Sequence, residues 1–239
     1  GQGVPSGGES QLTVLLKHLA LHPATAQHLA RKLCTWWFDV PPEAAVQELA
    51  AVYLRTGGSL PALWHGAREL HQRLGGGPVF KDPMHYLVSA VQALYGNTPV
   101  LNAQPLLRWM RLLGQPLLGR STPDGYPLQG SYWLSSGQLA QRIELAQELV
   151  AHAHRLTTPA PLLPPFVLPA KAPNRFELPD LRTLPSAKRW LEKQADGMAP
   201  TPGTPGTPAG DSAGAAAGAS ASQWSLYLAS PEFMYRAGI

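Results

Sequence analysis

Apolar residues recur every three or four positions along most of the first 157 residues, which is the spacing of one face of an α-helix. The first of these stretches carries a stripe of leucines: Leu12, Leu15, Leu16 and Leu19. Most of these stretches begin with a proline in the first turn, preceded in several cases by Ser or Asp, and end at a Gly. The pattern predicts helices over about these ranges: 11–22, 23–37, 42–56, 60–74, 83–95, 102–113 and 135–156.

Alternating runs of β-branched residues, which are typical of strands, are nearly absent, so the predicted fold class is all-α. Residues 8–157 are expected to form a single helical domain of roughly seven helices. Eight prolines between residues 158 and 185 favour an extended conformation, so residues 158–196 are predicted to be a proline-rich extension with one short helix. Residues 197–222 have the composition of a low-complexity linker. Residues 223–239 are expected to form a last helix that docks on the helical domain.

Composition narrows the possible functions. The net charge of +4 is spread along the chain without runs of Lys and Arg, which argues against a nucleic-acid partner. No apolar stretch approaches the length of a membrane span. The single cysteine, Cys34, excludes an intrachain disulfide. Because the chain opens on Gly1 rather than on Met, we expect it to be a piece of a longer protein or a processed product.

Two clusters near the N-terminus allow a binding interpretation beside a purely structural one. Trp36 and Trp37 follow each other at a helix end, where they are either core residues or an aromatic platform for a partner or a carbohydrate. His18 and His22 are four residues apart and are weak metal candidates, together with His28 or Cys34. Alternatively, the two histidines interact with the carbonyl end of their helix. No motif of a known cofactor or catalytic site is present, so no cofactor is expected.

The long loop over residues 123–133 is the strongest candidate site, because long loops in compact domains are often functional. It combines one carboxylate, Asp124, with three aromatic residues, and Arg142 follows in the next helix. We expect Asp124 to pair with Arg31, Lys32 or Arg142. The aromatic members of this candidate site are Tyr126, Tyr132 and Trp133. The alternative is a plug over the helical core, with Trp133 buried and the carboxylate in a simple turn.

Seven motifs occur in a fixed order at residues 22–26, 31–34, 40–42, 112–118, 123–127, 133–135 and 228–236. Together they resemble the C-terminal half of the bacterial family catalogued as domain of unknown function 1800. The resemblance covers residues 10–157 and 223–236, and the proline-rich and Thr-Pro-Gly segments between them depart from the family pattern. It implies a longer, exported parent with a periplasmic or secreted address. It also implies a protein partner, such as a sulfatase-like or alkaline-phosphatase-like neighbour. The resemblance supplies no catalytic residues.

The chain is therefore expected to be a helical interaction or assembly module that acts with a protein partner or with its own upstream half. Two alternatives stay open. The first is a hydrolase-like enzyme whose active site spans both halves of the parent protein. The second is a carbohydrate-binding module that uses the aromatic loop over residues 123–133.

Overall fold

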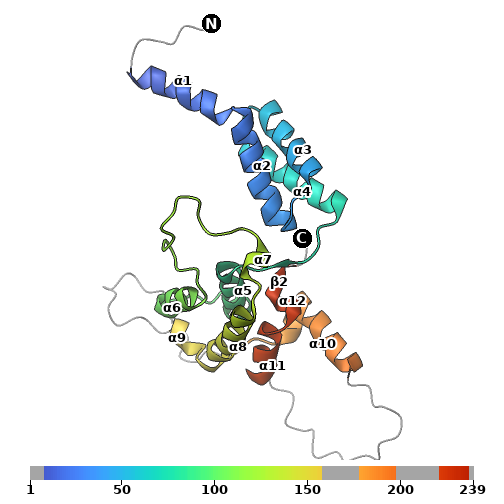
Figure 1. Ribbon diagram of the computed structural model, residues 1–239. Helices are drawn as coiled ribbons and strands as arrows, with labels where there is room; N and C mark the ends of the chain where they lie inside the picture. The colour runs from blue at the N-terminus through green and yellow to red at the C-terminus, as the bar shows by residue number, and fades with distance from the viewer. Residues whose placement is uncertain (1–7, 158–177, 198–220, 237–239) are drawn as a thin grey trace, which may run out of the picture. The chain divides into compact units, whose positions relative to one another are not determined.

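The structure, a computed structural model, describes residues 8–157, 178–197 and 221–236 (Figure 1). It confirms the predicted all-α fold class, because helices account for nearly all of the regular structure in these residues. The two strands that occur among them, β1 (Val79–Phe80) and β2 (Tyr235–Arg236), have two residues each.

The chain divides into two compact units. The described part of unit 1 comprises residues 8–80 and 127–132. The described part of unit 2 comprises residues 81–126 and, from Trp133 onward, the remaining described residues. The single domain expected over residues 8–157 thus extends over both units, and each unit is described separately below.

Unit 1 is built from four helices whose ends follow the local signals in the sequence. Ser59 accepts a hydrogen bond from the backbone N–H of Ala62 at 3.3 Å and so caps the fourth helix. His22 caps the second helix through Nδ1, which accepts from the N–H of Ala24 at 3.2 Å. The helices are α1 (Gly8–Ala20), α2 (Pro23–Phe38), α3 (Glu43–Arg55) and α4 (Leu60–Leu74).

Helices α2, α3 and α4 pack against one another around a common core. The α2 side of this core consists mainly of small side chains, Ala26, Ala30 and Cys34, which let the helix axes approach closely. Larger side chains of the other two helices, such as Leu49 and Leu70, fill the remaining space. By contrast, every residue of α1 is exposed, and this helix leads away from the other three (Figure 1).

Unit 2 contains the remaining helices of the described residues. Asp82 and Ser135 cap two of them, accepting from the N–H groups of His85 at 2.9 Å and Gln138 at 3.2 Å. The helices that lie wholly in this unit are α5 (Pro83–Tyr95), α6 (Gln104–Leu112), α8 (Ser136–Ala151), α9 (His154–Thr157), the 3-10 helix η1 (Leu181–Thr183), α10 (Pro185–Gly197), α11 (Ala221–Leu228) and α12 (Pro231–Met234).

The C-terminal helix α11 packs against α8, although more than sixty residues separate them in the sequence. The hydroxyl of Tyr86 on α5 lies between the two helices, 3.3 Å from the carbonyl oxygen of Arg142 and 3.2 Å from that of Leu228. Trp224, also on α11, donates its indole N–H to the carbonyl oxygen of Pro179 at 2.8 Å. These contacts dock one face of α11 on the rest of unit 2.

Three expected elements differ in detail from those observed. The last helix is split into α11 and α12, because Pro231 cannot continue a helix and Ser230 caps the new one. The long helix expected to reach Leu156 ends at Ala151, and a separate turn, α9, follows it. Within the expected loop over residues 114–136, four residues form the short helix α7 (Gly130–Trp133).

Residues 158–177 of the expected proline-rich extension and residues 198–220 of the expected linker lie outside the described residues. The short helix expected over residues 186–196 is present as α10. None of the described helices combines the length and the apolar character that crossing a lipid bilayer requires.

Candidate functional site

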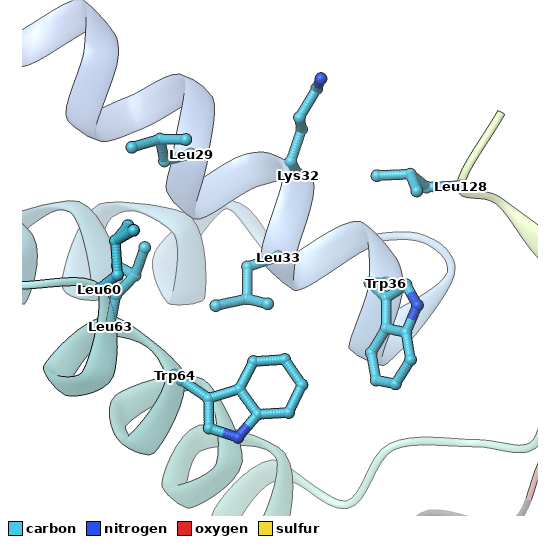
Figure 2. A pocket seen from close by; sticks show the side chains of 8 residues that line it. All are labelled: Leu29, Lys32, Leu33, Trp36, Leu60, Leu63, Trp64 and Leu128. Atoms are coloured by element: carbon cyan, nitrogen blue, oxygen red, sulfur yellow. The ribbon is translucent and has the colours of Figure 1, made fainter. Parts of the chain in front are cut away.

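An apolar groove of about 410 Å³ lies between α2 and α4 in unit 1 (Figure 2). Leucines and tryptophans form most of its walls, and Lys32 is the one charged residue in its lining. Figure 2 shows the Lys32 side chain extending away from the others. The groove therefore offers hydrophobic contact and aromatic ring faces, with few polar groups. Its lining residues are Leu29, Lys32, Leu33, Trp36, Leu60, Leu63, Trp64 and Leu128.

The α2 wall of the groove consists of residues at helical spacing. Leu29, Leu33 and Trp36 are four and three residues apart, so they lie on one face of the helix. The core residues of α2, such as Ala30 and Cys34, lie on the adjoining face of the helix. The apolar surface of α2 is therefore wide: one part of it meets the core and its margin forms the groove wall, while His28 and Arg31 on the other side of the helix are exposed.

Two adjacent tryptophans take different positions. Trp37 is only 5% exposed, and its ring lies 4.9 Å from His71 and 5.7 Å from Trp64 between ring centroids. Trp36 faces the groove, with its ring centroid 5.9 Å from that of Trp64 at an interplanar angle of 47°. Trp64 is 46% exposed. The buried ring of Trp37 thus packs against the partly exposed rings of Trp36 and Trp64.

Asp39, at the end of α2, fixes the loop that completes the groove. Its carboxylate accepts hydrogen bonds from the backbone N–H groups of Gly130 at 2.5 Å and Ser131 at 3.4 Å. These bonds hold the loop that places Leu128 beside Trp36. Asp39 adopts a φ of 64°, which is uncommon for a residue with a side chain. Gly130 is required here, because a Cβ atom would lie 2.4 Å from the carbonyl oxygen of Phe80.

Sequence reasoning missed Asp39, Leu60, Trp64 and Leu128 as members of this site. The predicted helix over residues 60–74 contained Leu60 and Trp64. The sequence pattern did not indicate that the two side chains would be exposed. Nothing in the sequence indicated that Asp39 would bind residues 91 positions away.

Arg31, another predicted site residue, faces α3 rather than the groove. Its guanidinium forms an ion pair with Glu43 at 2.9 Å, and both side chains are about half exposed. The hydrogen bond from Arg31, followed by one from Gln47, lowers the pKa of the Glu43 carboxyl group. Asp124, which we expected as a partner of Arg31, Lys32 or Arg142, has other partners.

In unit 2, Asp124 is exposed and interacts with its own loop. Its carboxylate lies 3.4 Å from the Arg120 guanidinium and accepts a hydrogen bond from the Thr122 hydroxyl. That hydrogen bond, followed by the contribution of Arg120, lowers the pKa of Asp124. The carboxylate is therefore committed to contacts within its own loop.

The structure brings two of the three loop aromatic residues together. Tyr126 and Trp133 have ring centroids 6.3 Å apart, at an interplanar angle of 49°. The Tyr126 hydroxyl donates to the carbonyl oxygen of Pro116 at 2.9 Å, and Trp133 is 4% exposed. Tyr132 is 62% exposed and belongs to unit 1. Tyr126 and Trp133 therefore pack as loop core and do not present two parallel exposed rings, as a sugar platform would.

Arg142 is fully buried, and a second buried cation, Lys81, lies near it. One guanidinium nitrogen donates to the carbonyl oxygen of Lys81 at 2.7 Å, and the guanidinium carbon lies 4.8 Å from the centre of the Tyr86 ring. The Lys81 ammonium group lies 4.1 Å from the centre of the Phe233 ring. Burial, with a smaller contribution from Arg142, lowers the pKa of Lys81 to about 8. Arg142 and Asp124 are not paired.

The weak metal candidates do not form a ligand set in the structure. His18 and His22 have ring centroids 6.1 Å apart, and His22 uses its Nδ1 atom to cap α2. Cys34 is buried in the core of unit 1, and burial raises the pKa of its thiol to about 11. Among the described residues, no three His, Cys, Asp or Glu side chains are grouped to hold a metal ion.

Comparison with known proteins places the chain in a family. The family model described as "Protein of unknown function (DUF1800)" matches residues 1–235. The match is wider than the resemblance, which was restricted to residues 10–157 and 223–236. A match of this extent does not support the narrower expectation of a C-terminal half. No curated protein and no solved structure matches the chain significantly. The chain belongs to the DUF1800 family of proteins of unknown function.

Proposed function

We propose that this chain is a helical protein-interaction module, which binds a protein partner through the exposed leucines of α1 and the apolar groove between α2 and α4. The observation that carries the proposal is that one unit presents two uncovered apolar surfaces. Proteins that act alone rarely leave large contiguous apolar patches in water.

Helix α1 is the first of these surfaces. Four leucines on one face have exposed fractions between 50% and 56%: Leu12, Leu15, Leu16 and Leu19. A helix of 13 residues without buried side chains is only marginally stable in water. A partner that covers the leucine face would stabilise α1, because each Å² of apolar surface removed from water contributes about 25 cal/mol.

The groove is the second surface. Its exposed members include Leu60 at 60% and Trp64 at 46%, and tryptophan is the residue type most enriched at the energetic centres of protein interfaces. The rings of Trp36 and Trp64 are held in place by the buried Trp37, so binding would order few additional side chains. A preorganised apolar groove of this kind fits an apolar helix face, as in other helix-in-groove complexes.

The proposal is tested by site-specific photocrosslinking in the organism that produces the protein. A photoreactive residue replaces Leu60 in the groove or, as a control, Leu118, which is 95% exposed in unit 2. We expect a discrete protein adduct from position 60, with the crosslink in an apolar segment of the partner, and none from position 118. The adduct should decrease strongly when Trp64→Gln is added.

Equal labelling from positions 60 and 118, or an adduct that is insensitive to Trp64→Gln, would show that the groove is not a docking surface. Circular dichroism of the Trp64→Gln protein serves as the folding control, since Trp64 also contacts the buried Trp37.

A further inference from the structure

We propose that the groove between α2 and α4 binds α1 of a second copy of this chain, so that two copies exchange their α1 helices in a symmetric dimer. This inference rests on the proposed function and names its partner. Each copy supplies one apolar helix and one apolar groove, and both surfaces are covered by the same event.

Helix α1 is held away from the groove of its own copy. The Tyr53 hydroxyl donates to the carbonyl oxygen of Ala20 at 3.2 Å, and the Thr25 hydroxyl donates to that of Leu19 at 2.8 Å. These two bonds fix the C-terminal end of α1 on the rest of unit 1. Helix α1 leads away from this anchor (Figure 1), and its leucines are exposed, so a second molecule can reach them.

The two surfaces match in length. The α1 stripe runs from Leu12 to Leu19, and the α2 wall of the groove runs from Leu29 to Trp36. Each stretch spans seven residue steps, which is about 10 Å of helix at 1.5 Å per residue. A leucine face of this length can lie along the whole α2 wall of the groove.

The charges at the edges are complementary. Lys32 stands at the rim of the groove, and Glu9 stands one turn before Leu12 on α1. Within the part of the chain that the structure describes, neither Glu9 nor Lys32 forms an ion pair. The nearest other cation on α2, Arg31, is already paired with Glu43. A second copy would supply the carboxylate that Lys32 lacks.

Symmetry favours exchange over a one-sided contact. A specific stable interface buries about 800 Å² on each partner, so the extent of the buried surface decides whether a contact is stable. Reciprocal exchange uses the helix and the groove of both copies, so it doubles the buried surface. It also closes the assembly at two copies, because α1 and the groove of each copy are then both occupied.

The first test is the mass of the full chain in solution. Sedimentation and native mass spectrometry should show a dimer of the 25.7 kDa chain. Leu16→Glu on α1 and Leu60→Glu in the groove should each weaken dimerisation by about 30-fold or more, the effect typical of a central interface residue. Both side chains are more than half exposed, and an acidic residue is favourable in the first turn of α4, so both variants should fold. Leu118→Glu is the matched control and should remain a dimer.

The second test distinguishes exchange from other dimers. A mixture of the Leu16→Glu and Leu60→Glu chains retains one intact helix and one intact groove, so we expect heterodimers that are weaker than the wild-type dimer but tighter than the homodimer of either variant. Lys32→Glu should weaken the wild-type dimer by about fivefold, and adding Glu9→Lys should restore it.

A monomer at every concentration, or a dimer that is unaffected by both leucine variants, would overturn the exchange. If photocrosslinking at position 60 then captures a different protein in an apolar segment, the groove is a docking surface but its occupant is not α1. If position 60 captures nothing, the proposed function fails as well.

Discussion

Replacing Trp224 with alanine is expected to lower the free energy of unfolding of unit 2 by about 3–5 kcal/mol, the range for a fully buried tryptophan. Trp224 has no exposed surface, and its ring meets that of Tyr227 edge to face at 6.2 Å. Its N–H also donates to the Pro179 carbonyl oxygen. Losing the ring leaves a cavity beside Tyr227 and leaves that carbonyl oxygen without its indole donor. Urea unfolding followed by circular dichroism measures the change.

Two controls separate the contributions. Leu226→Ala lies on the same helix but is 62% exposed, so it should change the free energy of unfolding by less than about 0.5 kcal/mol. Trp224→Phe keeps most of the ring and loses the hydrogen bond, for an expected cost of about 1 kcal/mol or more. If Trp224→Ala unfolds no more easily than Leu226→Ala, α11 does not dock on unit 2 in solution.

Lys81→Met should remove a pH dependence of stability. The Lys81 side chain is 8% exposed, and burial lowers its pKa from the ordinary value of 10.5 to about 8. Between these two pH values, the unfolded chain binds more protons at this residue than the folded chain does. In the wild type, Lys81 therefore makes the free energy of unfolding rise with pH. The methionine variant lacks this contribution.

The expected size of this effect follows from the shift. Relative to Lys81→Met, the wild type should gain about 2 kcal/mol of stability between about pH 7.5 and about pH 9.5. Comparing the two proteins at each pH cancels the opposite contribution of Cys34, whose thiol has a raised pKa in both. Lys188→Met, on the exposed side of α10, is the control and should follow the wild type. Parallel curves for Lys81→Met and the wild type would show that the Lys81 ammonium group is solvated.

The helices could be predicted because their ends are encoded locally. Pro23, Ser59 and Asp82 each stand where the structure begins a helix, and each acts through neighbours within three residues in the chain. Local signals, Ser230 and Pro231, also mark the break before α12. We nevertheless expected one continuous helix, because the apolar residues keep helical spacing across the break. Local chemistry therefore decides helix boundaries, which the sequence displays.

The groove could not be predicted, because it depends on which side chains the tertiary packing covers. Trp36 and Trp37 are adjacent and chemically identical, yet one faces the groove and the other lies in the core. The burial of Arg142 was also unexpected, since an arginine in a helix usually remains in water. In both cases the outcome depends on residues far away in the sequence, such as Trp64 for Trp36 and Lys81 for Arg142.

The central claim is that a protein covers α1, and amide hydrogen exchange of residues 8–20 tests it most directly. The chain is isolated from its own organism under native conditions, and exchange is measured before and after its partners are removed by dilution and gel filtration. We expect slow exchange in the assembled form and fast exchange in the stripped chain, because α1 alone is marginally stable. Equal exchange in both forms would show that nothing binds α1, and would contradict the proposed function.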